Sequence, residues 1–286
     1  MIDPPSTVTA TPTSGRASNR CLLWISAAFL IVVVGMWAYF TPAGLLGKAD
    51  AVGYAVCHRI QARSFLFPDG RPLPMCARCS GTFLGVLVGL LGPGLLLRRG
   101  RAASFPSPAI LAALLAMSLL WAFDGANSFA HLLPYDRIPR LYPPTNFLRL
   151  LTGMLHGITM GSLVLPVVNA TLWIDAINAP TLNRWWHLPV LYGIGAALMG
   201  LVLSGLGVFL YPLALLSALG ALSMLAIVNL VVLLTLFRRE NTARTLADAL
   251  PLILVGAALA ILMVGAIDAM RYAAFGTWAG FVPPMP

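Results

Sequence analysis

Residues 76–97 read CARCSGTFLGVLVGLLGPGLLL, two cysteines followed by a long apolar run. The run extends from Gly81 to Leu97, close to the roughly 20 residues that a helix needs to cross about 30 Å of hydrocarbon. The cysteines come directly before the run, so they fall in the first turn of this helix or just ahead of it. The stretch therefore predicts a membrane-spanning helix that carries two thiols at one membrane surface.

The composition of the whole chain extends this interpretation. Hydrophobic residues make up 59% of the 286 residues and charged residues only 9%, where soluble domains have about 25% charged residues. The mean hydropathy is +0.87. We therefore predict an all-α fold, a polytopic transmembrane helical bundle of about seven spans with a Cys-rich interfacial loop. The expected spans are Leu22–Phe40, Gly81–Leu97, Ala109–Leu133, Leu150–Trp173, Leu188–Leu210, Leu213–Phe237 and Leu250–Met270.

The chain divides into a membrane domain and two tails. Residues 1–20 are polar and rich in Pro, Ser and Thr, which indicates a disordered cytoplasmic tail. Residues 21–271 form the membrane domain, in which 41–80 is a Cys/His loop. Residues 272–286 form a C-terminal tail. The first apolar run has no clear small-residue cleavage site, so we expect a retained span and not a signal peptide.

Basic residues divide equally between the two sides of such a bundle, nine on each. Arg98-Arg99-Gly100-Arg101 and Arg238-Arg239 abut span ends, where the positive-inside bias is strongest. We therefore expect a cytoplasmic N-terminus and an extracytoplasmic Cys loop in a prokaryotic plasma membrane. The net charge of +9 suggests contact with the lipid bilayer and with an anionic lipid or small anion. Without a soluble basic domain, nucleic acid is not an expected partner.

The loop holds two cysteine clusters about twenty residues apart, Cys57-His58 and Cys76-Ala77-Arg78-Cys79. The positive end of a helix dipole and the neighbouring Arg78 both favour thiolate over thiol. Such sulfurs bind metals or exchange electrons. The structural alternative is a disulfide, for instance Cys57 to Cys76, across an extracytoplasmic loop. Cys21 begins the first span at the opposite face, so we expect an inert thiol.

Polar residues recur at helical spacing near the same end of three other spans. Asp124, Asn127 and His131 share one face of the third span, and Arg149, Thr152 and His156 share one face of the fourth. Asp268 and Arg271 lie near the end of the last span. Ionisable groups inside a span are costly and usually face a partner or a wet cavity. We expect these groups to converge near the cysteines, although each has a structural alternative: Asp124 pairing Arg149, and Asp268 pairing Arg271.

Two spans also carry small residues every four positions, which lets membrane helices approach closely. The stripes are Gly81, Gly85 and Gly89 in the second span and Gly153, Gly157 and Gly161 in the fourth. We expect these two faces to meet each other, or both to meet the third span. The alternative is that glycine is simply frequent in membrane helices.

The motifs together resemble a known family. Cys57-His58, Arg63-Ser64-Phe65, Cys76-Ala77-Arg78-Cys79-Ser80-Gly81, Asp124-Gly125, Asn146-Phe147-Leu148-Arg149 and Thr152-Gly153 occur in order. This order is similar to a prokaryotic family of predicted integral membrane proteins of unknown function. The resemblance covers residues 50–165 and implies a shared site at these positions, without an established reaction. The extra spans at 188–270 lie outside it.

Three functions remain open. The first is a zinc or iron site with Cys57, His58, Cys76 and Cys79 as ligands, in which His131 or His156 is an alternative histidine ligand. Around it, Asp124, Arg149 and His156 are candidate catalytic residues, and Arg63, Arg78 and Asn146 candidate ligand-binding residues. The second is a thiol–disulfide oxidoreductase that passes electrons to a quinone. The third is a transporter or scaffold in which arginines bind an anion and the cysteines are structural.

Overall fold

The computed structural model describes residues 13–133 and 140–280. These residues form eight α-helices, one 3₁₀ turn and two short strands. In chain order the elements are α1 (Thr13–Phe40), α2 (Gly44–Val56), η1 (Gln61–Arg63), α3 (Ala77–Leu95), β1 (Ala102–Ser104), α4 (Pro108–Ala130), α5 (Asn146–Leu172), β2 (Ile177–Pro180), α6 (His187–Leu203), α7 (Gly207–Leu236) and α8 (Leu246–Phe275). The prediction of an all-helical bundle is confirmed.

Among the described residues, six helices are long and apolar enough to cross a membrane: α1, α3, α4, α5, α7 and α8. The fifth predicted span, 188–210, is interrupted. Helix α6 ends at Leu203 because Gly205 takes a left-handed conformation (φ +70°), and α7 already begins at Gly207. At 1.5 Å per residue the 17 residues of α6 reach about 25 Å, less than the hydrocarbon thickness.

Helices α3 and α5 form the centre of the bundle, and their glycine faces meet as predicted. A Cβ atom at Gly85 would lie 2.9 Å from the Ile158 backbone nitrogen, and one at Gly89 would lie 2.8 Å from that of Ser162. From α5, a Cβ at Gly157 would overlap the carbonyl oxygen of Thr82. The two backbones are therefore in direct contact along the whole stripe, an approach that only glycine permits.

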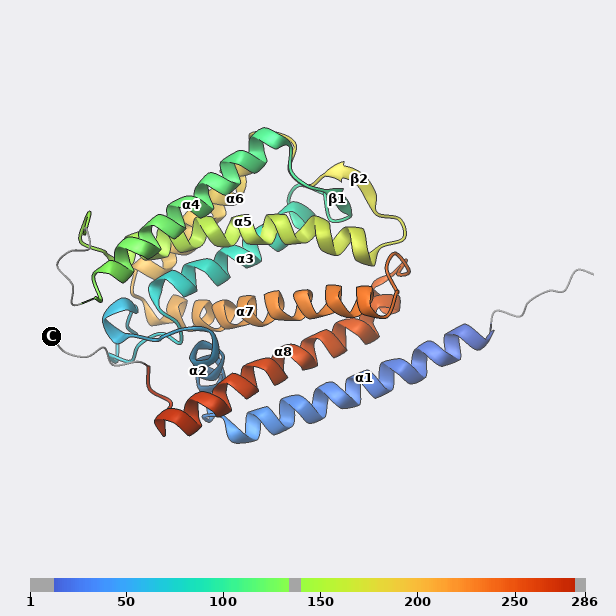
Figure 1. Cartoon of the computed structure of the whole chain (residues 1–286), viewed down its shortest axis with the longest axis horizontal. Helices are drawn as coiled ribbons and strands as arrows, with labels where there is room; N and C mark the ends of the chain where they lie inside the picture. Colours follow the sequence, from blue (N-terminus) through green and yellow to red (C-terminus); the bar gives the residue numbers. More distant parts are fainter. Residues whose placement is uncertain (1–12, 134–139, 281–286) are drawn as a thin grey trace, which may run out of the picture.

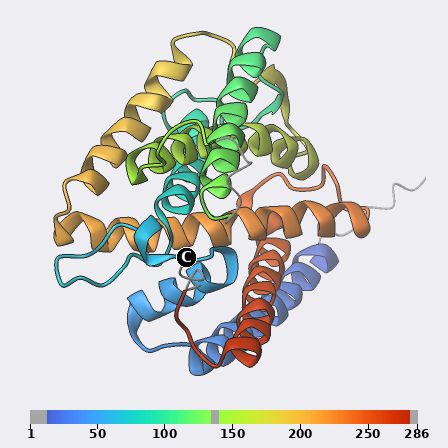
Figure 2. The same ribbon diagram turned by 60° about the vertical axis from the view of Figure 1, so that its left-hand side comes forward.

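The other helices lie on either side of this pair, with α4 beyond α5 and with α7, α8 and α1 beyond α3 (Figures 1 and 2). Helix α4 packs on α5, and α7 packs on α3 and leads to α8. Helix α1 packs on α8 at the edge of the bundle. Only 11% of its apolar window is buried, so most of α1 is left for lipid. Helix α1 starts at Thr13, within the stretch assigned to a polar tail, and residues 1–12 lie outside the described residues.

The two ends of the bundle differ. One end holds α2, η1 and the segment after α8, which folds back because Gly276 ends the helix with φ +66°. The opposite end holds β1 and β2, a parallel pair that the sequence analysis did not predict. This end also has an exposed ion pair between Arg101 and Asp175. Basic residues flank both ends of the bundle, as the even division in the sequence indicates. Among them, Arg137 lies outside the described residues.

Candidate functional site

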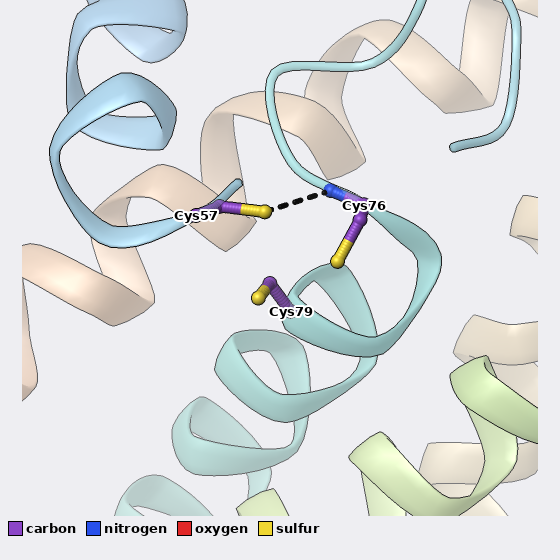
Figure 3. A group of neighbouring side chains, drawn as sticks. All are labelled: Cys57, Cys76 and Cys79. Atoms are coloured by element: carbon purple, nitrogen blue, oxygen red, sulfur yellow. Dashed lines mark hydrogen bonds between the residues drawn. The ribbon is translucent and has the colours of Figure 1, made fainter. Parts of the chain in front are cut away.

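Three thiols gather at the end of the bundle that carries α2 (Figure 3). Cys57 follows the last turn of α2, Cys76 is the N-cap of α3, and Cys79 lies in the first turn of α3. Their sulfur atoms all lie within 4.8 Å of one another. All three are free thiols, and Cys57 and Cys76 are buried. The predicted convergence of the two cysteine clusters is therefore present in the structure.

Close backbone packing brings Cys57 to the other two cysteines. A Cβ at Gly53 would lie 2.7 Å from the carbonyl carbon of Pro74, so the last turn of α2 rests directly on the residues that precede Cys76. Arg271 of α8 holds the same turn from the other side, because its Nη1 donates to the carbonyl oxygens of Tyr54 and Cys57, the latter at 2.9 Å. The expected convergence of Arg271 with the cysteines is therefore present, through the backbone carbonyl of Cys57.

The hydrogen bonds at the three cysteines favour the deprotonated form of only one of them. The sulfur of Cys57 accepts from the backbone N–H of Cys76 at 3.3 Å and from that of Arg59 at 3.4 Å. Hydrogen bonds from the thiols of Cys76 and Cys79 hold the pKa of Cys57 well below its ordinary value. The same hydrogen bond to Cys57 raises the pKa of Cys76 to about 12. Cys57 therefore ionises first, and its charge holds the proton on Cys76.

A buried carboxylate lies beside the first turn of α3. Asp124 of α4 is 2% exposed and forms an ion pair with Arg78. It also accepts hydrogen bonds from the Tyr142 hydroxyl at 2.9 Å and the Thr152 hydroxyl at 3.3 Å. The predicted pair of Asp124 with Arg149 is therefore wrong as the primary contact. Arg78 reaches the carboxylate because the glycine stripes bring α3 against α5, whereas Arg149 donates to Asn146 at 2.8 Å.

The arginines near Asp124 carry more positive charge than this one carboxylate can neutralise. Arg149 is 6% exposed, and its Nε finds no hydrogen-bond partner among the described residues. It lies close enough to Arg63 and Arg78 to repel both. Burial lowers the pKa of Arg63, and the charge of Arg78 lowers it further. Arg63 donates to the Ser128 carbonyl at 2.8 Å, so these guanidinium groups converge on one small region.

Asn146 joins this region to the cysteine loop. Its side-chain amide donates to the carbonyl oxygens of Ala62 at 3.3 Å and Ser64 at 3.5 Å. The start of α5 is thereby fixed against η1, which carries Arg63. The predicted ligand-binding residues Arg63, Arg78 and Asn146 therefore lie together, with Arg149 among them.

The histidines lie apart from the group of three sulfurs. His58 accepts from the Ile60 backbone N–H through Nδ1 at 3.0 Å. Burial lowers the pKa of His58; the thiolate of Cys57 opposes this effect, and the nearby arginines reinforce it. His131 contacts the carbonyl oxygen of Asn127 at 2.9 Å. His156 stacks on Trp121, with ring centroids 4.2 Å apart, and bonds Ser118 at 3.0 Å.

Sequence reasoning missed two residues of the site. Tyr142 lies in the loop before α5, where no spacing relates it to Asp124. Asp50 of α2 binds Arg59 at 2.7 Å and also pairs with Arg71, which ties α2 to the loop that leads to Cys76. One hint of Asp50 is present in the sequence: it is the only acidic residue of the segment Gly44–Val56.

Fold and site together define an integral membrane protein, a multi-pass helical bundle with a three-cysteine group at one end. Residues 57–163 match the model of an uncharacterised family described as "Predicted membrane protein (DUF2085)". The match begins at Cys57, includes Asp124 and Arg149, and ends in α5, so α1 and α6–α8 lie outside it. Neither the curated proteins nor the solved structures contain a match to this chain.

Proposed function

We propose that Cys57, Cys76 and Cys79 bind a zinc or iron ion, and that Arg63 and Arg149 hold an anionic ligand beside it. The observation that carries the proposal is the convergence of three sulfurs within 4.8 Å at a buried position. Thiolates are the preferred ligands of these metals. The chain would then be a membrane protein with a metal centre at one surface.

The residues present fit such an ion. Zinc–sulfur bonds of about 2.3 Å in a tetrahedral site separate sulfurs by roughly 3.8 Å, so the three thiols need only a small closure. Cys57 supplies the first thiolate, because its sulfur accepts two backbone hydrogen bonds. A bound ion would polarise whatever ligand takes a remaining coordination position. His58 adjoins Cys57 in sequence, and its lowered pKa keeps the imidazole neutral, but it lies outside the group of three sulfurs and would have to move toward them to become the fourth ligand.

The arginines supply the anion specificity in this proposal. Arg149 is buried with an unpartnered Nε, and Asp124 already accepts from Arg78, Tyr142 and Thr152. An anionic lipid head group or a small anion would offset the surplus positive charge. Asp124 then acts as a positioning residue that orients Arg78, because both of its oxygens are occupied. Arg149 contacts the ligand. His156 remains a candidate proton carrier, near Trp121.

The metal content of the purified protein tests the first part of the proposal, the metal centre. Elemental analysis of detergent-purified protein should find about one metal ion per chain. Cys76→Ser should lose most of it, because two thiolates bind far more weakly than three. Cys21→Ser is the matched control, since Cys21 is an exposed thiol on α1, and it should keep the full content. A monodisperse wild-type protein without metal would disprove the metal centre.

A second function is supported by the same thiols, because they are free and adjacent. Oxidation of two of them breaks two S–H bonds, forms one S–S bond and releases two protons and two electrons. A membrane quinone can accept both and become a quinol. Counting free thiols on the same sample separates the two functions: a redox pair loses two thiols under oxidant and regains them under reductant, whereas metal ligands stay reduced and shielded.

We also propose that the thiol end is extracytoplasmic, in a prokaryotic plasma membrane. Arg98, Arg99, Arg101, Arg238 and Arg239 follow span ends at the opposite face, which the positive-inside bias places in the cytoplasm. Cys21 begins near that face and is exposed. In intact cells a membrane-impermeant maleimide should leave Cys21 unlabelled, and permeabilised cells should show labelling. Labelling of Cys21 in intact cells would reverse the orientation.

A further inference from the structure

A large pocket lies between α1 and α8, outside the segment that matches the family model. Its volume is about 660 Å³, within the range of pockets that hold drug-sized ligands. The lining extends from Val33 to Thr41 on α1 and from Ile261 to Ala273 on α8. These residues are eight and twelve positions apart along their helices, so the pocket runs roughly 12 to 18 Å along the helix axes. Trp278, from the segment after α8, also lines it.

One buried carboxylate gives this apolar pocket its chemistry. Asp268 is 2% exposed. Its Oδ2 accepts from the indole N–H of Trp37 at 3.3 Å, and its Oδ1 has no hydrogen-bond partner among the described residues. Thr41 does not supply a donor, because its hydroxyl donates to the Trp37 carbonyl at 2.8 Å. A buried acceptor without a partner is destabilising, so the pocket lacks one hydrogen-bond donor.

The side chains around Asp268 favour a ligand that is uncharged, donates a hydrogen bond and contains a planar ring. Arg59 and Arg271 place positive charge near Asp268, so the pocket favours a neutral donor over a further cation. Four aromatic side chains line the pocket, Phe40 and the group of Trp37, Tyr272 and Trp278, and aromatic faces favour a planar ring. Most of the remaining lining residues are apolar. Met36 and Phe40 are more than half exposed at its rim, so the pocket borders the lipid.

We propose that this pocket binds a hydroquinone, a lipid-soluble ring whose phenolic hydroxyl donates to Oδ1 of Asp268. The ring lies among the group of three aromatic residues, and its alkyl tail follows the apolar groove between α1 and α8 toward the bilayer centre. Trp37 also packs against the hydrophobic cluster that contains Cys57 and Cys76. The proposal concerns binding and holds for either function of the cysteines.

Calorimetric titration of the full chain in lipid nanodiscs tests it with decylubiquinol, a hydroquinone with an alkyl tail. The wild type should bind it, and should bind decylubiquinone about tenfold more weakly, because the quinone has no hydroxyl to donate. Asp268→Leu should weaken quinol binding at least tenfold. Gly265→Leu should do the same by filling the pocket, since a Cβ there already lies 3.3 Å from Trp37.

The control is Gly35→Leu, which adds the same side chain to α1 at a position with no atom within 4 Å and should bind like the wild type. Size-exclusion profiles establish that each variant is folded, and Gly265→Leu keeps the test valid if Asp268→Leu does not fold. Absence of quinol binding to the wild type would overturn the proposal. So would unchanged binding in Gly265→Leu, or tighter binding of dodecyltrimethylammonium than of the quinol, which would identify a cation site.

Discussion

Replacing Gly157 by alanine is expected to destabilise the folded protein strongly. The added Cβ would overlap the Thr82 carbonyl oxygen and lie 2.8 Å from its carbon. Both atoms belong to the α3 backbone and cannot move without the whole helix. Overpacking a core commonly costs about 1–3 kcal/mol, and the rigid neighbours here place the cost at or above the top of that range.

Thermal unfolding in detergent measures this effect. Gly200→Ala is the matched control, because Gly200 lies inside α6 and has no neighbouring atom within 4 Å. Alanine is about 1 kcal/mol more favourable than glycine inside a helix, so the control should unfold at the same or a slightly higher temperature. A Gly157→Ala protein with wild-type stability would show that α3 and α5 do not touch through their glycines.

Replacing Arg78 by methionine is expected to have the second large effect. The substitution keeps the length of the side chain and removes the ion pair, which leaves the 2% exposed Asp124 without its counter-charge. Breaking a buried pair from one side costs about 3–5 kcal/mol. Tyr142 and Thr152 still donate to Asp124, so the loss belongs at the lower end of this range.

Arg101→Met is its control, because the Arg101–Asp175 pair is exposed on both sides, 37% and 58%. Exposed pairs contribute about 0–1 kcal/mol. In addition, the double substitution Arg78→Met with Asp124→Leu should recover part of the loss, since no isolated charge remains. Equal unfolding temperatures for Arg78→Met and Arg101→Met would contradict a buried pair at this position.

The sequence was sufficient for most of the bundle because hydrophobic length and glycine spacing are local signals. The stripe from Gly81 to Gly89 needed only helical periodicity to predict a close partner, and Gly153–Gly161 offered the same spacing. The end of α6 was missed because Ser204 and Gly205 form only a short break in a long apolar run. The strands β1 and β2 were missed because they join loops 75 residues apart.

The candidate site was also predictable in part, because some of its contacts follow from local spacing along one helix. Cys76 and Cys79 lie in one helical turn, so their proximity follows from spacing alone. The third thiol required knowing that Gly53 lets α2 rest on Pro74, a tertiary contact without a sequence signature. The partner of Asp124 was misassigned because Arg78 reaches it from α3, whereas helical periodicity indicated only which residues share a face of α4 or α5.

The segment after α8 has a practical consequence for experiments. Arg59, two residues beyond Cys57, donates to the carbonyl oxygen of Trp278 at 3.0 Å, and Tyr54 donates to that of Thr277 at 2.8 Å. Any fluorescent or affinity fusion joined just after this stretch sits against the thiol-bearing loop. Attachment ahead of α1 keeps the appended protein at the far end of the bundle, so it is the preferred place for purification tags.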